Sequence, residues 1–226
     1  MGMNKVKGNM YDWVTHTWNP IRGKCPHECS YCYMKRFKVG ELRLEEKELK
    51  TNLGAENMIF VGSSTDMWAD KVPRKWIIEV LECCNSYPYN TYLFQTKNPK
   101  RFKEFIDYIN FPQNVVLGTT LETSFSVFNL SKAPQPLDRA WALADIKTKD
   151  KMVSIEPIMS FNFSELLVMI QDIKPKFVSI GADSQGHGLP EPDPEKLGFL
   201  IDELKKFTEV RIKSNMKRLL EHKKNI

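Results

Sequence analysis

The sequence has no long hydrophobic run. Its longest apolar stretches, residues 76–78 and 166–170, are far shorter than the roughly 20 residues that a membrane-spanning helix needs. No secretory signal, internal repeat or low-complexity segment stands out. These absences favour a soluble globular protein with no membrane partner, and we expect a cytoplasmic location in a reducing compartment.

A strong excess of one charge is also missing. The chain carries 33 Lys and Arg against 28 Asp and Glu, for a net charge of +5. This mildly basic balance permits an anionic partner without requiring one. The basic residues gather beside a cysteine-rich loop and in residues 211–226, a predicted basic C-terminal helix or tail. Each of these two basic clusters is either an ordinary solvated surface or a surface that binds the phosphates of a nucleic acid.

The chain is too short for two comfortable domains, so residues 1–226 are expected to form a single α/β domain. Short apolar, β-rich runs alternate with helical patterns, which predicts a parallel sheet with helical crossovers. Strands are predicted at residues 13–18, 58–62, 91–95, 115–120, 152–156 and 177–181, with a seventh at 210–213. Helices are predicted at residues 73–84, 99–109, 137–146, 163–173, 194–207 and 215–222.

The five cysteines are an odd number, which argues against a disulfide framework. Cys25, Cys29 and Cys32 form a Cys-x3-Cys-x2-Cys loop, with Tyr31 before the last cysteine. Three thiolates alone do not complete the four-ligand set of a structural zinc site or of an ordinary 4Fe–4S cluster. Zinc remains an alternative, because His27 lies inside the loop as a possible fourth ligand.

The spacing and the aromatic residue resemble the signature of radical S-adenosylmethionine (SAM) enzymes. The resemblance implies that Cys25, Cys29 and Cys32 hold a 4Fe–4S cluster whose fourth iron binds SAM. An external flavodoxin- or ferredoxin-like reductant would supply the electron that cleaves SAM to methionine and a 5′-deoxyadenosyl radical, which abstracts hydrogen from a substrate. It also implies a partial (β/α)6 TIM-type barrel, the radical SAM core, with a cluster loop at residues 19–38.

A narrower resemblance rests on Trp18-Asn19-Pro20 before the cysteines, and extends through residues 154–157 and 180–183. It is to a phage- and prokaryote-associated three-Cys-motif family of unknown function. That family is named alongside a separate partner protein, which implies a possible partner here too. A weaker similarity, mainly through the cysteine loop, is to spore photoproduct lyase, a radical SAM enzyme of DNA repair.

In parallel barrels, site residues follow the C-terminal ends of the strands. The resemblance implies that Tyr31 packs near adenine and that the turn after the second strand meets the SAM ammonium; that turn is otherwise a helix cap. Acidic residues after the fourth and fifth strands can accept hydrogen bonds from ribose hydroxyls, or else form ordinary salt bridges. The predicted cofactor-binding residues are Tyr31, Gly62, Ser63, Ser64, Asp66, Thr120, Glu122, Glu156 and Gly181.

Lys97 and Lys213 follow other strands and are candidate anion-binding residues. Cys83 and Cys84 are predicted to be ordinary core residues of a helix, because adjacent helical positions point about 100° apart. No motif identifies the substrate. An open barrel and the basic flanks favour nucleic acid or a nucleotide. The alternatives are radical SAM modification of a protein or peptide partner, and a non-catalytic zinc-binding module that binds nucleic acid.

Overall fold

The computed structural model describes residues 2–8, 10–106 and 111–221. Its centre is an eight-stranded sheet with the strand order β1-β2-β5-β6-β7-β8-β9-β10. β1 is antiparallel to β2, and every other neighbouring pair in this sheet is parallel. The strands are β1 (Asn4–Lys5), β2 (His16–Trp18), β5 (Met58–Val61), β6 (Thr91–Thr96), β7 (Val115–Thr120), β8 (Asp150–Ile155), β9 (Phe177–Ile180) and β10 (Glu209–Ile212).

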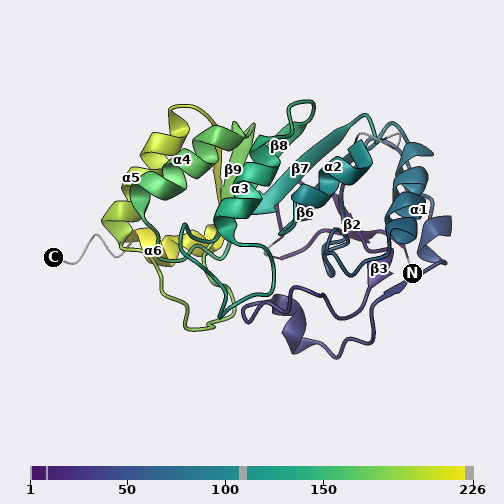
Figure 1. The fold of residues 1–226 in the computed structure, drawn as a ribbon, viewed down its shortest axis with the longest axis horizontal. Coiled ribbons are helices and arrows are strands. Elements are labelled where there is room, and N and C mark those ends of the chain that lie inside the picture. Colours follow the sequence, from purple (N-terminus) through teal and green to yellow (C-terminus); the bar gives the residue numbers. More distant parts are fainter. Residues whose placement is uncertain (1, 9, 107–110, 222–226) are drawn as a thin grey trace.

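The helices of the crossovers cover the outer face of this sheet (Figure 1). They are α1 (Arg74–Asn85), α2 (Lys100–Ile106), α3 (Pro136–Ala144), α4 (Phe163–Ile173) and α5 (Pro194–Lys205). Local chemistry fixes several of their starts. The Asn162 side chain accepts a hydrogen bond from the Glu165 amide, and Asp193 caps α5, which has a proline in its first turn. The result is the predicted partial (β/α)6 TIM-type barrel.

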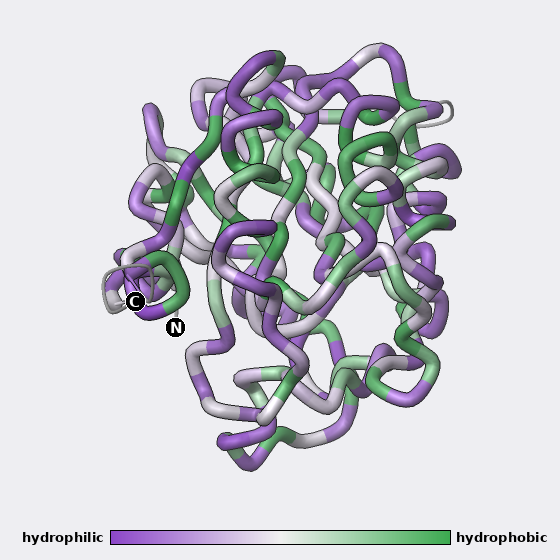
Figure 2. The backbone as a smooth tube through the Cα atoms, turned by 90° about the vertical axis from the view of Figure 1, so that its left-hand side faces the viewer, coloured by the Kyte–Doolittle hydropathy of each residue, from purple (hydrophilic) through white to green (hydrophobic). Residues whose placement is uncertain are grey.

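The strands are hydrophobic on both faces because each face meets a different layer. Val61 and Phe94 belong to the large cluster shared with the helices, whereas their neighbours Phe60 and Leu93 belong to a second cluster inside the barrel. The inner cluster also contains Tyr11 from the segment before β2. Figure 2 shows hydrophobic residues along the central chain segments and hydrophilic ones in the surrounding loops.

The first crossover differs from the others, and no helix was predicted in it. No α-helix joins β2 to β5; residues 19–57, all described, hold the cysteine loop, the 3-10 helices η1 (Tyr33–Arg36) and η2 (Glu48–Lys50), and a two-stranded ribbon of β3 (Ile21–Arg22) and β4 (Arg43–Leu44). The predicted strand at 13–18 begins only at His16, because Tyr11 and Val14 of the preceding segment pack into the inner cluster. β1 was not predicted, since two residues show no periodicity.

The remaining elements match the prediction closely. The seventh strand is present as β10, so the start of the predicted basic tail belongs to the sheet. The helix predicted at 215–222 is a short η3 (Ser214–Met216) followed by α6 (Lys217–Leu220). Residues 107–109 of the second predicted helix, and residues 222–226 of the tail, lie outside the described residues. No helix in the described ranges is both long and apolar enough to cross a membrane.

Candidate active site

A cavity of about 440 Å³ lies at the C-terminal ends of the parallel strands. Cys25, Cys29 and Cys32 all line it, as do Tyr31 and the residues that follow β5. Figure 1 shows the loops that surround this end of the sheet below the strands. The predicted residues Thr120 and Glu156 line the same cavity, whereas Glu122 and Gly181 do not. Most of the predicted site residues therefore line a single cavity at the strand ends.

The cysteine loop is closed at its base by the β3–β4 ribbon. Ile21 and Arg22 pair with Leu44 and Arg43, and the amide of Lys24 donates to the Gly40 carbonyl at 2.9 Å. Gly23 has φ +108°, and a Cβ there would lie 2.1 Å from the Glu41 carbonyl oxygen. Only glycine therefore permits the two ends of the loop to meet at this point.

A distant segment, residues 127–133, supports the loop from its other side. The Ser30 amide donates to the Leu130 carbonyl at 2.7 Å, and the Lys132 amide donates to the His27 carbonyl at 2.8 Å. The Cys29 thiol lies 3.1 Å from the Ser131 hydroxyl. Sequence reasoning missed this segment, because no motif marks a contact between residues about a hundred positions apart.

Burial favours the protonated form of two of the three thiols. Burial, followed by the charge of Asp66, raises the pKa of the Cys25 thiol to about 12, and burial also raises the pKa of Cys32. Buried thiols of this kind stay protonated until a metal displaces the proton. No three His, Cys, Asp or Glu side chains in the described ranges converge as ligands of a single metal ion. The three thiols instead line one shared cavity.

His27, weighed as a fourth zinc ligand, has a different partner. Its Nε2 lies 2.9 Å from Asp66 Oδ2, and both side chains are almost fully buried. Asp66 also accepts hydrogen bonds from the Thr96 hydroxyl and from the amides of Trp68 and Lys97. Burial by itself would raise the pKa of Asp66, but the His27 charge and these donors hold it below its usual value. Asp66 thus ties the cysteine loop to the ends of β5 and β6.

The turn after β5 is organised by Asn19, which belongs to the Trp18-Asn19-Pro20 motif but was not among the predicted site residues. Its Oδ1 accepts hydrogen bonds from the Ser64 amide at 2.8 Å and from the hydroxyls of Ser63 and Ser64. Gly62 has φ +78° and donates its amide to the Trp18 carbonyl. The Trp18-Asn19-Pro20 segment therefore shapes the cavity wall, which gives the motif a physical role.

Glu122 lies beneath the cavity wall and is completely buried. Its carboxylate pairs with Lys97 and with Arg139 of α3, and it accepts a hydrogen bond of 2.5 Å from the Tyr31 hydroxyl. Burial opposes its ionisation, but Lys97 and then Arg139 outweigh burial and lower the pKa of Glu122 to about 2. The salt-bridge alternative considered for this residue is therefore the one present in the structure, and its predicted cofactor contact stays a prediction.

Glu156 faces the cavity and is paired with Lys213, whose Nζ lies 2.8 and 3.0 Å from its two oxygens. Burial raises the pKa of Glu156, and Lys213 opposes this shift. A Cβ on Gly181 would lie 2.7 Å from the Glu156 carboxyl carbon, so Gly181 leaves the space that this carboxylate occupies. Nearby, the Tyr11 hydroxyl donates to Ser154, which completes a polar wall.

Comparisons with solved structures agree with this architecture. A mutant of spore photoproduct lyase with bound AdoMet and dinucleoside spore photoproduct aligns with a TM-score of 0.64 and 11% identity, over 91% of this chain and 78% of that chain. Spore photoproduct lyase complexed with dinucleoside spore photoproduct aligns with a TM-score of 0.63 and 11% identity, over the same shares of the two chains. Identity this low shows a common fold. No curated protein matches the sequence.

Fold and site together define a partial-barrel protein of the radical SAM fold, with a three-cysteine loop at the C-terminal end of its sheet. The chain belongs to the family described as "Protein of unknown function (DUF5131)", whose model matches residues 9–184. That description names neither an activity nor a phage association. The more specific resemblance to a phage-associated family therefore stays a prediction.

Proposed function

We propose that this protein is a radical SAM enzyme that acts on nucleic acid or a nucleotide. The observation that carries the proposal is the arrangement of Cys25, Cys29 and Cys32, which line one cavity at the strand ends of a partial barrel. The same fold in spore photoproduct lyase with bound AdoMet supports the assignment.

Cys25, Cys29 and Cys32 would hold the 4Fe–4S cluster, and their chemistry fits it. All three are free thiols, and the carboxylate of Asp66, which contacts the loop, is occupied by His27 and by a β6 hydroxyl. When bound and reduced by an external flavodoxin- or ferredoxin-like protein, the cluster supplies the electron for reductive cleavage of SAM. The protein's own part is to position the thiols and to exclude water.

The remaining cavity residues fall into two groups with different tasks. Gly62, Ser63, Ser64 and Thr120 offer backbone and hydroxyl groups to the amino-acid and sugar parts of SAM. Glu156 and Lys213 form a charged pair that can exchange partners with polar ligand groups. Glu122 acts one layer below, where it holds the Tyr31 hydroxyl and thereby orients the ring beside the cysteines.

The proposal that the substrate is nucleic acid or a nucleotide rests on charge and on the fold neighbours. Lys7, Arg36, Lys97 and Lys213 all line the cavity. The fold neighbour spore photoproduct lyase was solved with a dinucleoside ligand. Binding to nucleic acid should weaken steeply as salt rises, because each phosphate contact releases counterions. Affinity that stays flat across a salt series would contradict this part of the proposal.

Anaerobic reconstitution with iron and sulfide tests the cofactor assignment. We expect a brown protein with about four irons per chain that forms 5′-deoxyadenosine from SAM after reduction with dithionite. Iron content, visible absorption and chromatography of the products provide the measurements. A colourless protein that binds one zinc ion and leaves SAM intact would instead support the non-catalytic zinc module.

Glu156→Gln should weaken SAM binding while leaving the cluster in place. The substitution removes the charge that pairs with Lys213 inside the cavity, but it touches none of the three cysteines. Isothermal titration with SAM and an iron count on the same sample provide the two readouts. Glu203→Gln, on the outer helix α5, is the matched control. Equal SAM affinity in wild type and Glu156→Gln would remove Glu156 from the binding residues.

A further inference from the structure

The outer part of the cysteine loop is unusually exposed for its composition. In residues 33–39, every side chain is exposed apart from the half-buried Met34. Tyr33, Phe37 and Val39 are 37%, 49% and 38% exposed. Burying apolar surface of this kind against a partner is favourable. A cluster of three exposed apolar residues within seven positions therefore indicates a contact surface.

Cations alternate with these apolar residues. Lys35, Arg36 and Lys38 lie between them, and residues 33–40 contain no acidic side chain. None of the three cations has a hydrogen-bonded or ion-pair partner among the described residues, whereas Lys132 nearby pairs with Glu28 at 2.8 Å. The Arg36 guanidinium instead lies 4.8 Å from the Phe37 ring centroid. The surface therefore offers free positive charge together with flat apolar rings.

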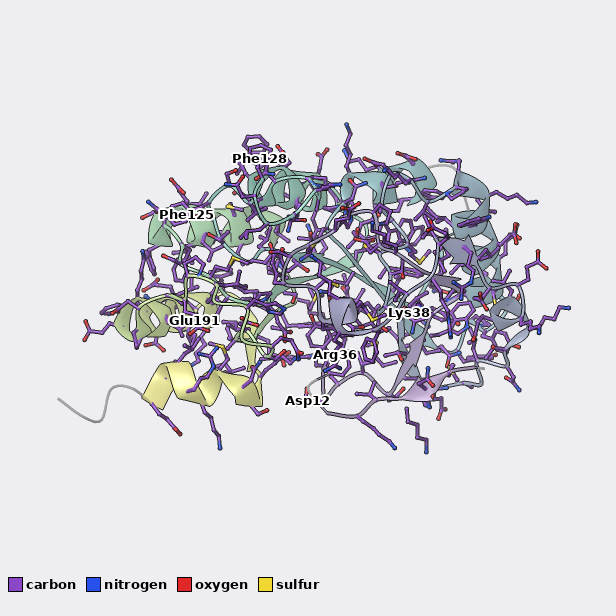
Figure 3. All side chains as sticks on the ribbon, turned by 90° about the horizontal axis from the view of Figure 1, so that it is seen from below. Asp12, Arg36, Lys38, Phe125, Phe128 and Glu191 are labelled. Carbon is purple, nitrogen blue, oxygen red and sulfur yellow. The ribbon has the colours of Figure 1, made fainter. Side chains whose placement is uncertain are left out.

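The same stretch runs directly into the cavity. Tyr33, Met34 and Arg36 line the cavity mouth, and exposed Lys7 from the segment after β1 also lines it. The Tyr33 hydroxyl donates to the Ser63 carbonyl at 2.9 Å, which fixes the ring against the turn after β5. Figure 3 looks onto this side of the molecule and labels Arg36 and Lys38. Phe125 and Phe128, the exposed aromatics after β7, lie well away from them in that view.

We propose that residues 33–39, the basic–aromatic strip, bind a single strand of nucleic acid and lead one nucleotide of it into the cavity. Proteins that bind single strands combine a positive track for the phosphates with aromatic rings on which bases stack. Lys35, Arg36 and Lys38 supply the track, and Phe37 and Tyr33 supply the rings. A duplex keeps its bases stacked inside and cannot use those rings. The inference deepens the proposed function by naming the strandedness of the substrate and the surface that receives it.

The test measures binding by fluorescence anisotropy over a salt series. The probes are a labelled single-stranded oligonucleotide of about 16 nucleotides, near the upper end of known site sizes, its RNA counterpart, and the matching duplex. We expect one or both single strands to bind more tightly than the duplex. Phe37→Ala should weaken that binding about five-fold or more, the loss typical of one stacked base. Phe199→Ala, which removes a 65% exposed ring on α5, should leave it unchanged.

The charge arm uses the double variant Arg36→Ala with Lys38→Ala. Log affinity falls as log salt rises, and we expect this fall to be less steep in the double variant. Its slope should shrink in magnitude by about 1.4, since each phosphate contact of a single strand contributes about 0.7. Lys100→Ala, at the exposed start of α2, is the charge control. Any of three results would overturn the inference. The duplex binds more tightly than the single strands, Phe37→Ala binds the single strand as tightly as wild type does, or poly-glutamate binds as tightly as the single strand.

The two proposals fail separately in this design. If wild-type protein forms 5′-deoxyadenosine from SAM yet binds no oligonucleotide, the proposals of a strand-binding strip and of a nucleic-acid substrate are wrong. The radical SAM assignment would stand. Protein that binds the single strand through Phe37, yet assembles no cluster, would keep the strip and overturn the enzyme assignment.

Discussion

Alanine in place of Cys25, Cys29 or Cys32 is expected to abolish cluster assembly and, with it, all formation of 5′-deoxyadenosine. The three thiols line the same cavity, and with three protein ligands the loss of any one leaves an iron without its anchor. Reconstituted variants should contain less than one tenth of the wild-type iron, an order-of-magnitude expectation from loss of a protein ligand. Iron analysis and visible absorption provide the measurement.

Cys83→Ala is the matched control for these variants. Cys83 is half-buried on α1, its thiol faces the Leu49 carbonyl at 3.5 Å, and it does not line the cavity. Its loss should cost at most a few kcal/mol of folding free energy, because a small cavity is left behind. Full iron content in a Cys25→Ala, Cys29→Ala or Cys32→Ala protein would contradict the ligand assignment, and loss of iron in Cys83→Ala would show that assembly failed for another reason.

Glu122→Gln is expected to be the most destabilising single substitution near the site. The change leaves Lys97 and fully buried Arg139 without their shared negative charge. Removing one member of a buried ion pair costs about 3–5 kcal/mol. Urea unfolding at pH 7, followed by circular dichroism, measures the free energy of unfolding. Glu203→Gln, whose pair with Lys206 is exposed, should change it by less than about 0.5 kcal/mol.

The pH dependence of this effect has a defined sign. Lys97 and Arg139, working against burial, hold the pKa of Glu122 at about 2 in the folded protein, compared with 4.5 for the free side chain. The folded state therefore binds this proton more weakly than the unfolded state, so the stabilisation is complete above about pH 4.5 and is lost as the pH falls toward 2. The difference between wild type and Glu122→Gln should shrink over that window. A difference below about 1 kcal/mol at pH 7 would contradict the buried network.

The sequence was sufficient for the regular elements of the barrel because their signals are local. Buried parallel strands appear as short apolar runs, and residues such as Asn162, Asp193 and Pro194 mark helix starts within a few positions. The ribbon of β3 and β4 escaped prediction because strands of two residues carry no alternation. No helix was predicted between residues 18 and 58, and the cysteine loop takes the position that a crossover helix usually occupies.

The site was only partly predictable. A residue's place after a strand indicates which end of the barrel it occupies, but not which side chains it contacts there. Glu122 and Glu156 both follow barrel strands, yet Glu122 is buried against Arg139 while Glu156 faces the cavity beside Lys213. The difference depends on which basic side chain lies beside each glutamate. Arg139 is on α3 and Lys213 follows β10, so the second partner is far from its glutamate in the sequence. Asn19 and His27 show the same limit, since their partners after β5 become neighbours only when β2 and β5 pair.

The support beneath the cysteine loop sets an order of events during synthesis. Ser30, Cys29 and His27 are held by residues 130–132, and Tyr31 is held by Glu122, about a hundred positions later. Protein chains emerge from the ribosome N-terminus first, so the cysteines leave it long before their supports exist. The loop therefore passes through a period in which its three thiols are exposed and lack the contacts that fix their positions. On the proposed assignment, iron and sulfide would bind at the finished site only after β7 and residues 127–133 have folded.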